Sequence, residues 1–218
     1  MALAVLYTFR RCPYAIRARL GLLLAQCNVE IREITLKTKP LEMLAASSKG
    51  TVPVLVLVNR DVIAQSLDIM RWALTQHDPL DLLCHKNPAD ADKMAALIEQ
   101  NDVQFKPWLD RYKYSDRYPE QTQTDYYQQA SRFLIQLEQC LSETPFLVSH
   151  TPRLADYAIV PFVRQFAAVE TKRALSDDFP AVAVWLERLM SSEIFIRAMH
   201  KHVIWNASHA PIYLLEDL

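Results

Sequence analysis

The stretch LYTFRRCPYAIR, residues Leu6–Arg17, decides the fold and contains the most informative residue of the chain, Cys12. The strand-like run Ala4–Phe9 leads through two arginines into Cys12-Pro13 and then into an amphipathic segment. Pro13 suits the first turn of a helix, where its missing N–H is harmless, so the pattern predicts Cys12 at the N-cap. The helix dipole, unpaired backbone N–H groups and the two guanidiniums would then favour the nucleophilic thiolate. We therefore expect a reactive cysteine, although a free cysteine is more often buried and inert.

The composition limits the class of protein. The 218 residues, 51% of them hydrophobic, suffice for a core in one or two domains. No apolar run reaches the length of a membrane span, and the first residues lack the basic region and the length of a signal peptide. The four cysteines form no CxxC pair and no Cys/His ligand pattern, so we expect neither a disulfide framework nor a metal site. Reduced thiols in a cytoplasmic protein fit this usage.

Charge is unevenly distributed along the chain. The net charge is −1, but residues 1–80 contain ten Lys or Arg against six Asp or Glu, a net of +4, which leaves −5 for the remainder. A mildly basic first part suits a small anionic ligand. It is too weak to indicate nucleic-acid binding, and no basic-aromatic stripe supports such binding.

The first part of the chain alternates strand and helix patterns. We expect strands at 4–9, 29–36, 52–58 and 62–64, and helices at 15–27, 40–46 and, capped by Ser66, at 67–75. This order is typical of a compact α/β unit, which we place at residues 1–78.

The strand signal ends after this unit. Long apolar-periodic segments at 89–109, 124–141, 154–169 and 181–200 predict an all-helical domain at 88–218, joined by a linker at 79–87. Pro107 and Pro161 lie inside these segments and should kink or break their helices. Gly21 and Gly50 are the only glycines, which excludes a glycine-rich phosphate loop.

The order of Cys12-Pro13-Tyr14, Thr51-Val52-Pro53 and Gln65-Ser66, followed by a helical half, resembles the cytosolic glutathione transferases. The likeness is greatest to Cys-type members such as the omega class and its bacterial relatives, and it is strongest over residues 5–72. It implies an α/β thioredoxin-like N-terminal domain followed by an all-α helical C-terminal domain. It also implies glutathione as co-substrate, no metal, and a homodimer.

The resemblance assigns a glutathione site to five residues. A cis bond between Val52 and Pro53 would offer the Val52 backbone to the peptide; the alternative is a trans edge-strand proline. The Ser66 hydroxyl and nearby helix amides would hold the γ-glutamyl carboxylate, with Gln65 on the ammonium; Ser66 could also be only a helix cap. Lys39 matches the lysine that reaches the glycyl carboxylate, or is a solvated surface residue.

Other residues have weaker assignments. Tyr7 stands near the tyrosine that stabilises the glutathione thiolate in other classes, and it competes with Cys12 unless it is an ordinary strand aromatic. Aromatic residues would line a second-substrate pocket between the halves, although core or interface packing is the better explanation for most of them: Phe9, Tyr14, Phe105, Trp108, Tyr112 and Tyr114. Arg153 to Asp156 resembles the family's helix-capping box with Arg153 in place of the hydroxyl residue, which leaves the reciprocal cap incomplete.

The resemblance predicts an enzyme, a glutathione-dependent thiol transferase or reductase. Cys12 would attack a glutathionylated or oxidised substrate, and a second glutathione would release the mixed disulfide. Ala15 stands where dithiol glutaredoxins have their second cysteine, so the cycle would use one thiol. Two alternatives stay open: conjugation of glutathione to electrophiles, and a binding or scaffold protein without turnover.

Overall fold

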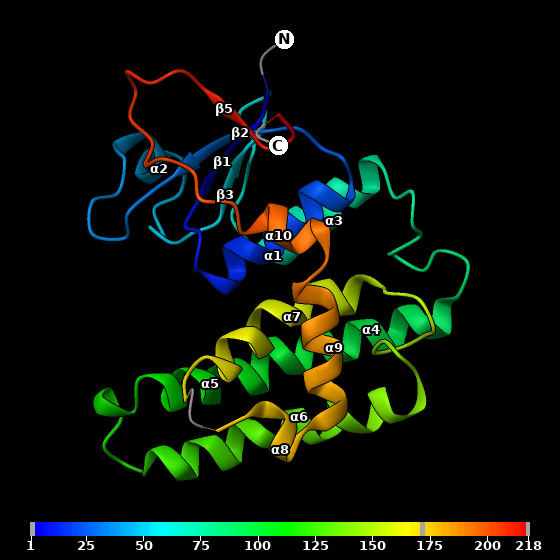
Figure 1. Ribbon diagram of the computed structural model, residues 1–218. Helices are drawn as coiled ribbons and strands as arrows, with labels where there is room; N and C mark the ends of the chain where they lie inside the picture. The colour runs from blue at the N-terminus through cyan, green and yellow to red at the C-terminus, as the bar shows by residue number, and fades with distance from the viewer. Residues whose placement is uncertain (1–2, 171–172, 217–218) are drawn as a thin grey trace. The chain divides into compact units, whose positions relative to one another are not determined.

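The computed structural model describes residues 3–170 and 173–216 of the chain. The chain forms two compact units: the first contains the residues up to Leu80 and those from Ser192 onward, and the second is Asp81–Ser191. The predicted limits, 1–78 and 88–218, therefore differ from the observed division at the C-terminal end. The residues from Ser192 onward return to the first unit as a helix and a strand (Figure 1).

The first unit contains a five-stranded sheet of the order β4-β3-β1-β2-β5. Its strands are β1 (Val5–Thr8), β2 (Glu30–Glu33), β3 (Val54–Val56), β4 (Val62–Ile63) and β5 (Ile212–Tyr213). β1 and β2 are parallel, and the other neighbouring pairs are antiparallel. The four strands expected before residue 80 are confirmed, each shorter than predicted. β5 lies in the part of the chain predicted to be all-helical, and it pairs with the outer edge of β2.

The helices of the first unit are α1 (Pro13–Leu24), α2 (Leu41–Ala46), α3 (Ser66–Gln76) and α10 (Glu193–Ala198). α1 is buried along almost its whole length because α3 and α10 both pack against it. At the closest approach, a Cβ atom on Gly21 would lie 2.6 Å from the Cα atom of Met70. Glycine is therefore the residue that lets α1 and α3 approach so closely.

α1 ends at Leu24, earlier than the predicted Cys27. Gln26 takes a left-handed conformation with φ of 52°. Its backbone N–H donates to the Leu23 carbonyl at 3.0 Å, and that of Cys27 donates to the Leu22 carbonyl at 2.8 Å. These two bonds form a Schellman motif, which closes the helix although no glycine marks its end.

The second unit, as far as the structure describes Asp81–Ser191, has only helical regular elements. They are α4 (Pro88–Gln100), a π-helical turn (Asn101–Phe105), α5 (Lys106–Lys113), a 3-10 turn (Ser115–Arg117), α6 (Gln123–Glu143), α7 (Leu154–Ala167), α8 (Leu175–Asp178) and α9 (Pro180–Met190). The π-helical turn lies directly before Pro107, whose missing N–H disturbs the regular bonding pattern. α7 continues through Pro161, so this proline does not break the helix, which was one of the two effects expected of it.

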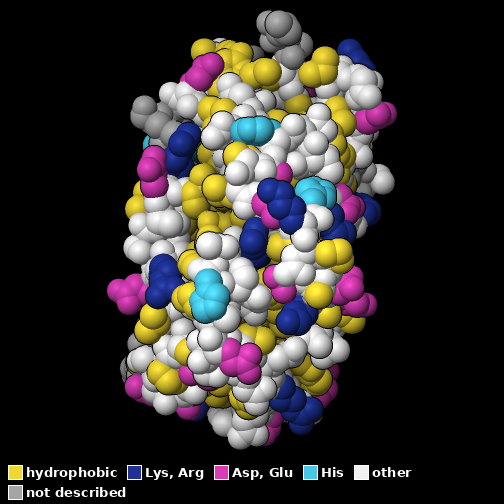
Figure 2. Space-filling model, turned by 90° about the vertical axis from the view of Figure 1, so that its right-hand side faces the viewer, with side chains coloured by type: hydrophobic (Ala, Val, Ile, Leu, Met, Phe, Trp, Pro, Cys, Tyr) yellow, Lys and Arg dark blue, Asp and Glu magenta, His cyan; other side chains and the backbone are white. Residues whose placement is uncertain are grey.

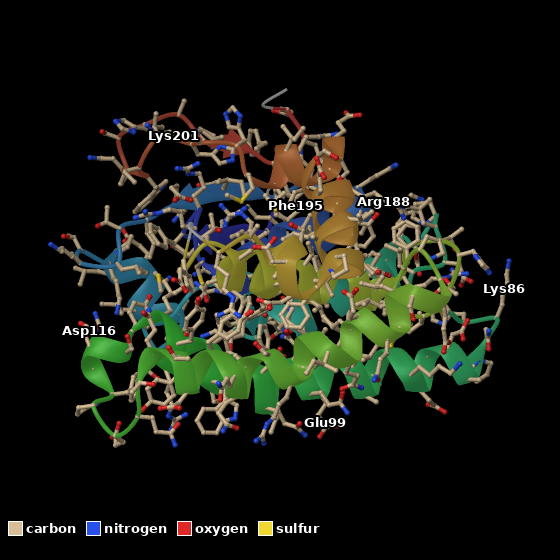
Figure 3. The ribbon with its side chains drawn as sticks, turned by 60° about the horizontal axis from the view of Figure 1, so that its bottom comes forward. Lys86, Glu99, Asp116, Arg188, Phe195 and Lys201 are labelled. Carbon is tan, nitrogen blue, oxygen red and sulfur yellow. The ribbon has the colours of Figure 1, made fainter. Side chains whose placement is uncertain are left out.

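The predicted helix 181–200 is two helices, α9 and α10. Ser192 separates them and starts the second, because its hydroxyl oxygen accepts from the Phe195 backbone N–H at 3.4 Å. Arg188 marks α9 and Phe195 marks α10 in Figure 3. The Phe195 side chain is buried, so α10 contributes to the core of the first unit.

Charged side chains of both signs are interspersed over the face seen in Figure 2. Within residues 3–170 and 173–216, no helix combines the length and the apolar character that crossing a membrane requires.

Candidate active site

Cys12 occupies the N-cap of α1, as predicted, with Pro13 as the first helical residue. Its backbone N–H donates to the Phe9 carbonyl at 3.0 Å, and its carbonyl accepts from the Ile16 N–H at 2.9 Å. The half-buried sulfur lies 3.8 Å from the Val52 carbonyl oxygen. This contact joins the strand-to-helix turn to the segment that precedes β3, 40 residues later in the chain.

Cys12 packs against a cluster of buried apolar side chains. Cys12 and Phe9 pack, partly buried, against these core residues: Tyr7, Ala15, Ile34, Met43, Val52 and Val54. Ala15, one helical turn after Cys12, is fully buried. The side chain in the position of a resolving cysteine is therefore a methyl group inside the core.

The segment Gly50–Pro53 lies beside Lys39. The Val52-Pro53 peptide bond is cis, which confirms the prediction. The Nζ atom of Lys39 lies 3.4 Å from the place where a Cβ atom on Gly50 would stand, and Gly50 has a φ of +60°. Among the described residues the Lys39 ammonium has no hydrogen-bond or ion-pair partner. The structure thus brings Lys39 next to the backbone that leads to Val52.

Gln65 and Ser66 stand at the start of α3. Gln65 is the N-cap and Ser66 the first helical residue, so the cap lies one residue before the predicted Ser66. Ser66 is buried, and its hydroxyl has no hydrogen-bond partner among the described residues. The unpaired amides of this first turn and the hydroxyl form a cradle of donors that suits a carboxylate. No hydrogen bond between described residues links this cradle directly to Cys12.

The two arginines that precede Cys12 differ in their surroundings. Arg11 is exposed, with its guanidinium 5.8 Å from the centre of the Phe9 ring. The backbone N–H of Arg10 donates to the Glu33 carboxylate at 2.7 Å. Glu33 is buried, and burial raises its pKa despite that bond and the nearby charges of Arg19 and Arg10.

Arg19 is a site residue that the sequence reasoning missed. It lies on α1, is 1% exposed, and hydrogen-bonds to Thr8, to the Arg10 carbonyl and to the Ala198 carbonyl. The available signal was a charged residue inside the otherwise apolar stretch ARLGLLL, where solvent exposure was not expected.

Tyr7 belongs to the apolar cluster against which Cys12 packs, but its hydroxyl bonds to Arg32. The Arg32 guanidinium donates to the Tyr7 hydroxyl at 2.9 Å, pairs with Glu30 at 2.7 Å and lies 4.5 Å from the centre of the Trp205 ring. Tyr7 also lines a groove of about 500 Å³ beneath α2, and Cys12 is not among the residues around that groove. Burial raises the pKa of Tyr7, which makes its phenol harder to ionise.

The residues predicted for a second-substrate pocket fall into both units. Phe9 and Tyr14 belong to the first unit, where Arg17 lies 5.9 Å from the Tyr14 ring. Trp108 belongs to the second unit, where the Arg111 guanidinium lies 5.1 Å from the centre of its ring and the Tyr126 ring centre lies 6.3 Å away. Their common role stays a prediction.

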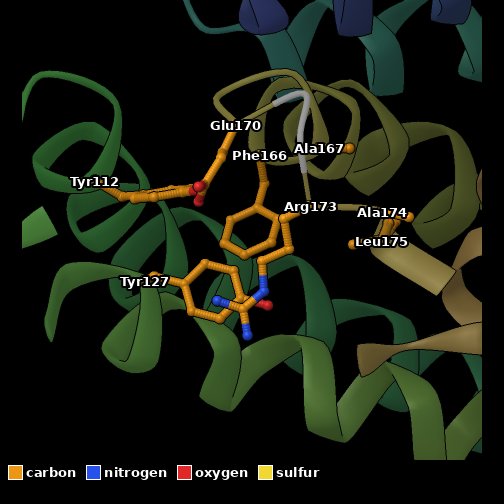
Figure 4. A pocket seen from close by; sticks show the side chains of 8 residues that line it. All are labelled: Tyr112, Tyr127, Phe166, Ala167, Glu170, Arg173, Ala174 and Leu175. Atoms are coloured by element: carbon orange, nitrogen blue, oxygen red, sulfur yellow. The ribbon is translucent and has the colours of Figure 1, made fainter. Parts of the chain in front are cut away.

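Tyr112 lies in an aromatic cluster inside the second unit (Figure 4). Its ring centre is 5.5 Å from that of Tyr127 and 5.3 Å from that of Phe166. Burial, with the charge of Glu170, raises the pKa of Tyr112 to about 12. Arg173 closes the cluster with its guanidinium 3.9 Å from the Tyr127 ring centre. The space among these side chains is only about 10 Å³, so this cluster is packed core.

Asp156 organises the start of α7. It is fully buried and accepts hydrogen bonds from three groups: the Arg153 N–H at 2.8 Å, the Leu147 N–H at 3.0 Å and the Trp185 indole at 2.8 Å. Arg153 donates instead to the Asp81 carbonyl at 2.6 Å. Asp156 therefore bonds the backbone of the N-cap residue Arg153, as expected for one half of a capping box. The Arg153 side chain does not supply the other half, but links the start of α7 to Asp81.

Within the described residues, no group of three or more His, Cys, Asp or Glu side chains could hold a metal ion. The four cysteines, all of which the structure describes, form no disulfide.

Comparison with known proteins agrees with this architecture. The family model of the glutathione S-transferase N-terminal domain matches residues 6–80, and that of the glutathione S-transferase C-terminal domain matches residues 104–188. Pyrimidodiazepine synthase of Drosophila melanogaster is 26% identical over 192 residues, which cover 84% of this chain and 75% of that protein.

Solved structures of several transferase classes share the fold. Glutathione transferase Omega 3C from Trametes versicolor superposes with a TM-score of 0.78 at 20% identity, over 93% of this chain and 91% of that chain. An epsilon-class glutathione S-transferase from the housefly, Musca domestica, gives a TM-score of 0.77 at 20% identity, over 89% and 91% of the two chains. The predicted fold class is confirmed, a thioredoxin-like N-terminal domain with a helical domain after it. The chain belongs to the glutathione S-transferase superfamily.

Proposed function

We propose that this chain is a glutathione-dependent thiol transferase in which Cys12 is the only nucleophile. The observation that carries the proposal is the position of the half-buried Cys12 at the N-cap of α1. A helix N-terminus stabilises negative charge, and the thiolate is the reactive form of cysteine. Tyr7, the competing residue, already accepts a hydrogen bond from Arg32 and lines another groove.

Glutathione binds, in this proposal, across three elements of the first unit. The Ser66 hydroxyl and the first amides of α3 hold the γ-glutamyl carboxylate, and the Gln65 amide oxygen accepts from the ammonium. The Lys39 ammonium reaches the glycyl carboxylate, and the Val52 backbone, beside Pro53, pairs with the peptide. In support, the side chains of Ser66 and Lys39 have no hydrogen-bond partner among the described residues, so both are available to a ligand.

The reaction is an exchange of disulfides. The Cys12 thiolate attacks the glutathione sulfur of a mixed disulfide, the substrate sulfur leaves as a thiolate, and a Cys12–glutathione disulfide forms. The thiolate of a second glutathione attacks this disulfide, so oxidised glutathione leaves and the Cys12 thiolate returns. The proton of the second glutathione ends on the released substrate thiol. Because Ala15 is a buried methyl group, an external thiol has to complete the cycle.

Turnover of a glutathionylated peptide with glutathione tests the proposal. Cys12→Ser should reduce thiol transfer to the rate without enzyme, while Tyr7→Phe should leave it intact. Conjugation of glutathione to a chloronitrobenzene is measured in parallel. Conjugation that survives in Cys12→Ser and is lost in Tyr7→Phe would replace the proposal with conjugation chemistry. Absence of both activities, together with no retention on immobilised glutathione, would indicate a scaffold protein.

The homodimer implied by the family is a second part of the proposal. Light scattering coupled to size-exclusion chromatography should give twice the mass of the 25.1 kDa chain. The mass of a single chain at micromolar concentration would contradict it.

A further inference from the structure

Arg19 is a buried cation directly behind the turn that presents Cys12. All three guanidinium nitrogens are engaged: Nη1 donates to the Thr8 hydroxyl, Nη2 donates to the Arg10 carbonyl at 2.7 Å, and Nε donates to the Ala198 carbonyl at 2.7 Å. Thr8 ends β1, and Ala198 ends α10. One side chain thus ties the catalytic turn to the strand before it and to the C-terminal helix of the same unit.

The turn itself has little freedom. Within it, the Cys12 N–H donates to the Phe9 carbonyl at 3.0 Å. Arg19 holds the Arg10 carbonyl, and Glu33 accepts from the Arg10 N–H at 2.7 Å. The two groups of the Arg10 backbone are therefore fixed by two buried, oppositely charged side chains.

The charge of Arg19 also acts on Cys12. Burial lowers the pKa of Arg19 to about 10, against the attraction of Glu33 and of Cys12, so the side chain stays protonated at neutral pH. The attraction is mutual: a cation that is favoured by the Cys12 thiolate favours that thiolate to the same degree. Water screens the exposed Arg11 far more than it screens a buried guanidinium.

The negative charge of Glu33 opposes the stabilisation of the Cys12 thiolate by Arg19. Its carboxylate interacts with Arg19 and with Arg10, and its Oε2 atom is buried without a hydrogen-bond partner among the described residues. A negative charge at this place compensates part of the Arg19 charge. Removal of the Glu33 charge should therefore strengthen the action of Arg19 on the sulfur.

We propose that Arg19 is the positioning residue of the Cys12 site: it fixes the turn from Thr8 to Cys12 and supplies the buried positive charge that stabilises the thiolate. The sequence-adjacent Arg11 then contributes less, although it stands next to Cys12 in the chain. This inference rests on the proposed function only in taking Cys12 as the reactive thiol.

The pH dependence of Cys12 alkylation by iodoacetamide tests the inference without glutathione. Mass spectrometry of the tryptic peptide Cys12–Arg17 separates this thiol from Cys27, Cys84 and Cys140. Arg19→Met should raise the midpoint of the profile by about one pH unit or more, which is the usual effect of losing a close opposite charge. Arg19→Lys should keep the midpoint close to that of the unsubstituted protein, since it keeps the charge.

Two further variants distinguish charge from loss of structure. Glu33→Gln should lower the midpoint, a direction that general loosening of the fold would not produce, and it carries the test if Arg19→Met does not fold. Arg11→Gln should shift the midpoint by less than Arg19→Met does. An unchanged midpoint in folded Arg19→Met, a raised one in Glu33→Gln, or an equal rise in Arg19→Lys would overturn the inference. Because no transfer is measured, failure of the thiol-transferase proposal would leave this result standing.

Discussion

The Cα atom of Met70 on α3 lies 2.6 Å from the position that a Cβ atom on Gly21 of α1 would occupy. The neighbouring atoms Cβ and Cγ of Met70 would each be 2.7 Å away. Since one of these contacts is with backbone, a side-chain rotation cannot relieve it. The close spacing of α1 and α3 therefore requires a residue without a side chain at position 21.

Gly21→Ala should lower the free energy of unfolding by roughly 1–3 kcal/mol, the usual result of overpacking a core. Helix propensity alone would change stability in the opposite direction, by up to ~1 kcal/mol. Urea denaturation followed by circular dichroism measures the change. Gly21→Ala should still lower stability when it is added to Met70→Ala, because the contacts with the Met70 Cα and Cβ atoms remain. A single variant as stable as the original protein would contradict the close approach.

Glu33 should make stability depend on pH. Burial raises the pKa of Glu33 in the folded protein above the ordinary value of 4.5, so the folded state binds the proton more tightly than the unfolded state does. The ionised form then costs stability, and this cost grows as the pH rises from below the unfolded value through the folded one. Relative to the original protein, Glu33→Gln should therefore gain stability as the pH is raised from about 4 to about 7. Thermal unfolding at each pH gives the comparison, and a gain that shrinks over this range would refute it.

Asp156 should be critical for the second unit. Asp156→Ala leaves the Leu147 N–H, the Arg153 N–H and the Trp185 indole without their acceptor, which should cost about 3 kcal/mol or more. Asp156→Asn retains one acceptor oxygen and should cost less. Asp177→Ala, an exposed aspartate on α8, is the control and should change stability by at most about 0.5 kcal/mol. Equal losses for Asp156→Ala and Asp177→Ala, measured by urea denaturation, would contradict the buried role.

Pairing with β5 should protect the backbone amides of β2 from hydrogen exchange. The Leu214 N–H donates to the Val29 carbonyl at 3.0 Å, and Leu214→Pro removes this donor. Hydrogen exchange of residues 29–33 should become faster, because the edge of β2 opens. Leu214→Ala keeps the N–H while it removes the same buried side chain, and is the matched control. If both variants exchange at the same rate in this segment, the backbone pairing is not what protects the edge.

Sequence patterns predict those parts of the fold that depend on neighbouring residues. The strand-to-helix turn at Cys12 was predictable because Pro13 excludes most other conformations. The end of α1 was not, because Gln26 adopts a left-handed conformation that sequence normally signals with glycine. The break before α10 depends on the Ser192 cap, a weak signal within a continuous apolar period.

Long-range contacts explain what the sequence could not reveal about the site. Two arginines beside Cys12 were the visible charges, yet Arg11 is exposed and Arg19 is buried. The difference arises because the turn that contains Thr8 and Arg10 and the remote Ala198 carbonyl both supply acceptors to Arg19. A pattern along one helix contains no information about such partners. The strand β5 was missed for the same reason, since its pairing with β2 joins residues about 180 positions apart.

The pairing of β5 with β2 has a consequence for synthesis of the protein. During synthesis β1, the Cys12 turn and β2 emerge early from the ribosome. Ala198 and β5 emerge only after the whole second unit has been made. Until then Arg19 lacks one of its three acceptors, and the edge of β2 has no neighbour. An unpaired strand edge is a place where another chain can add. The edge of β2 in the nascent first unit therefore stays open until Ile212–Tyr213 have been made.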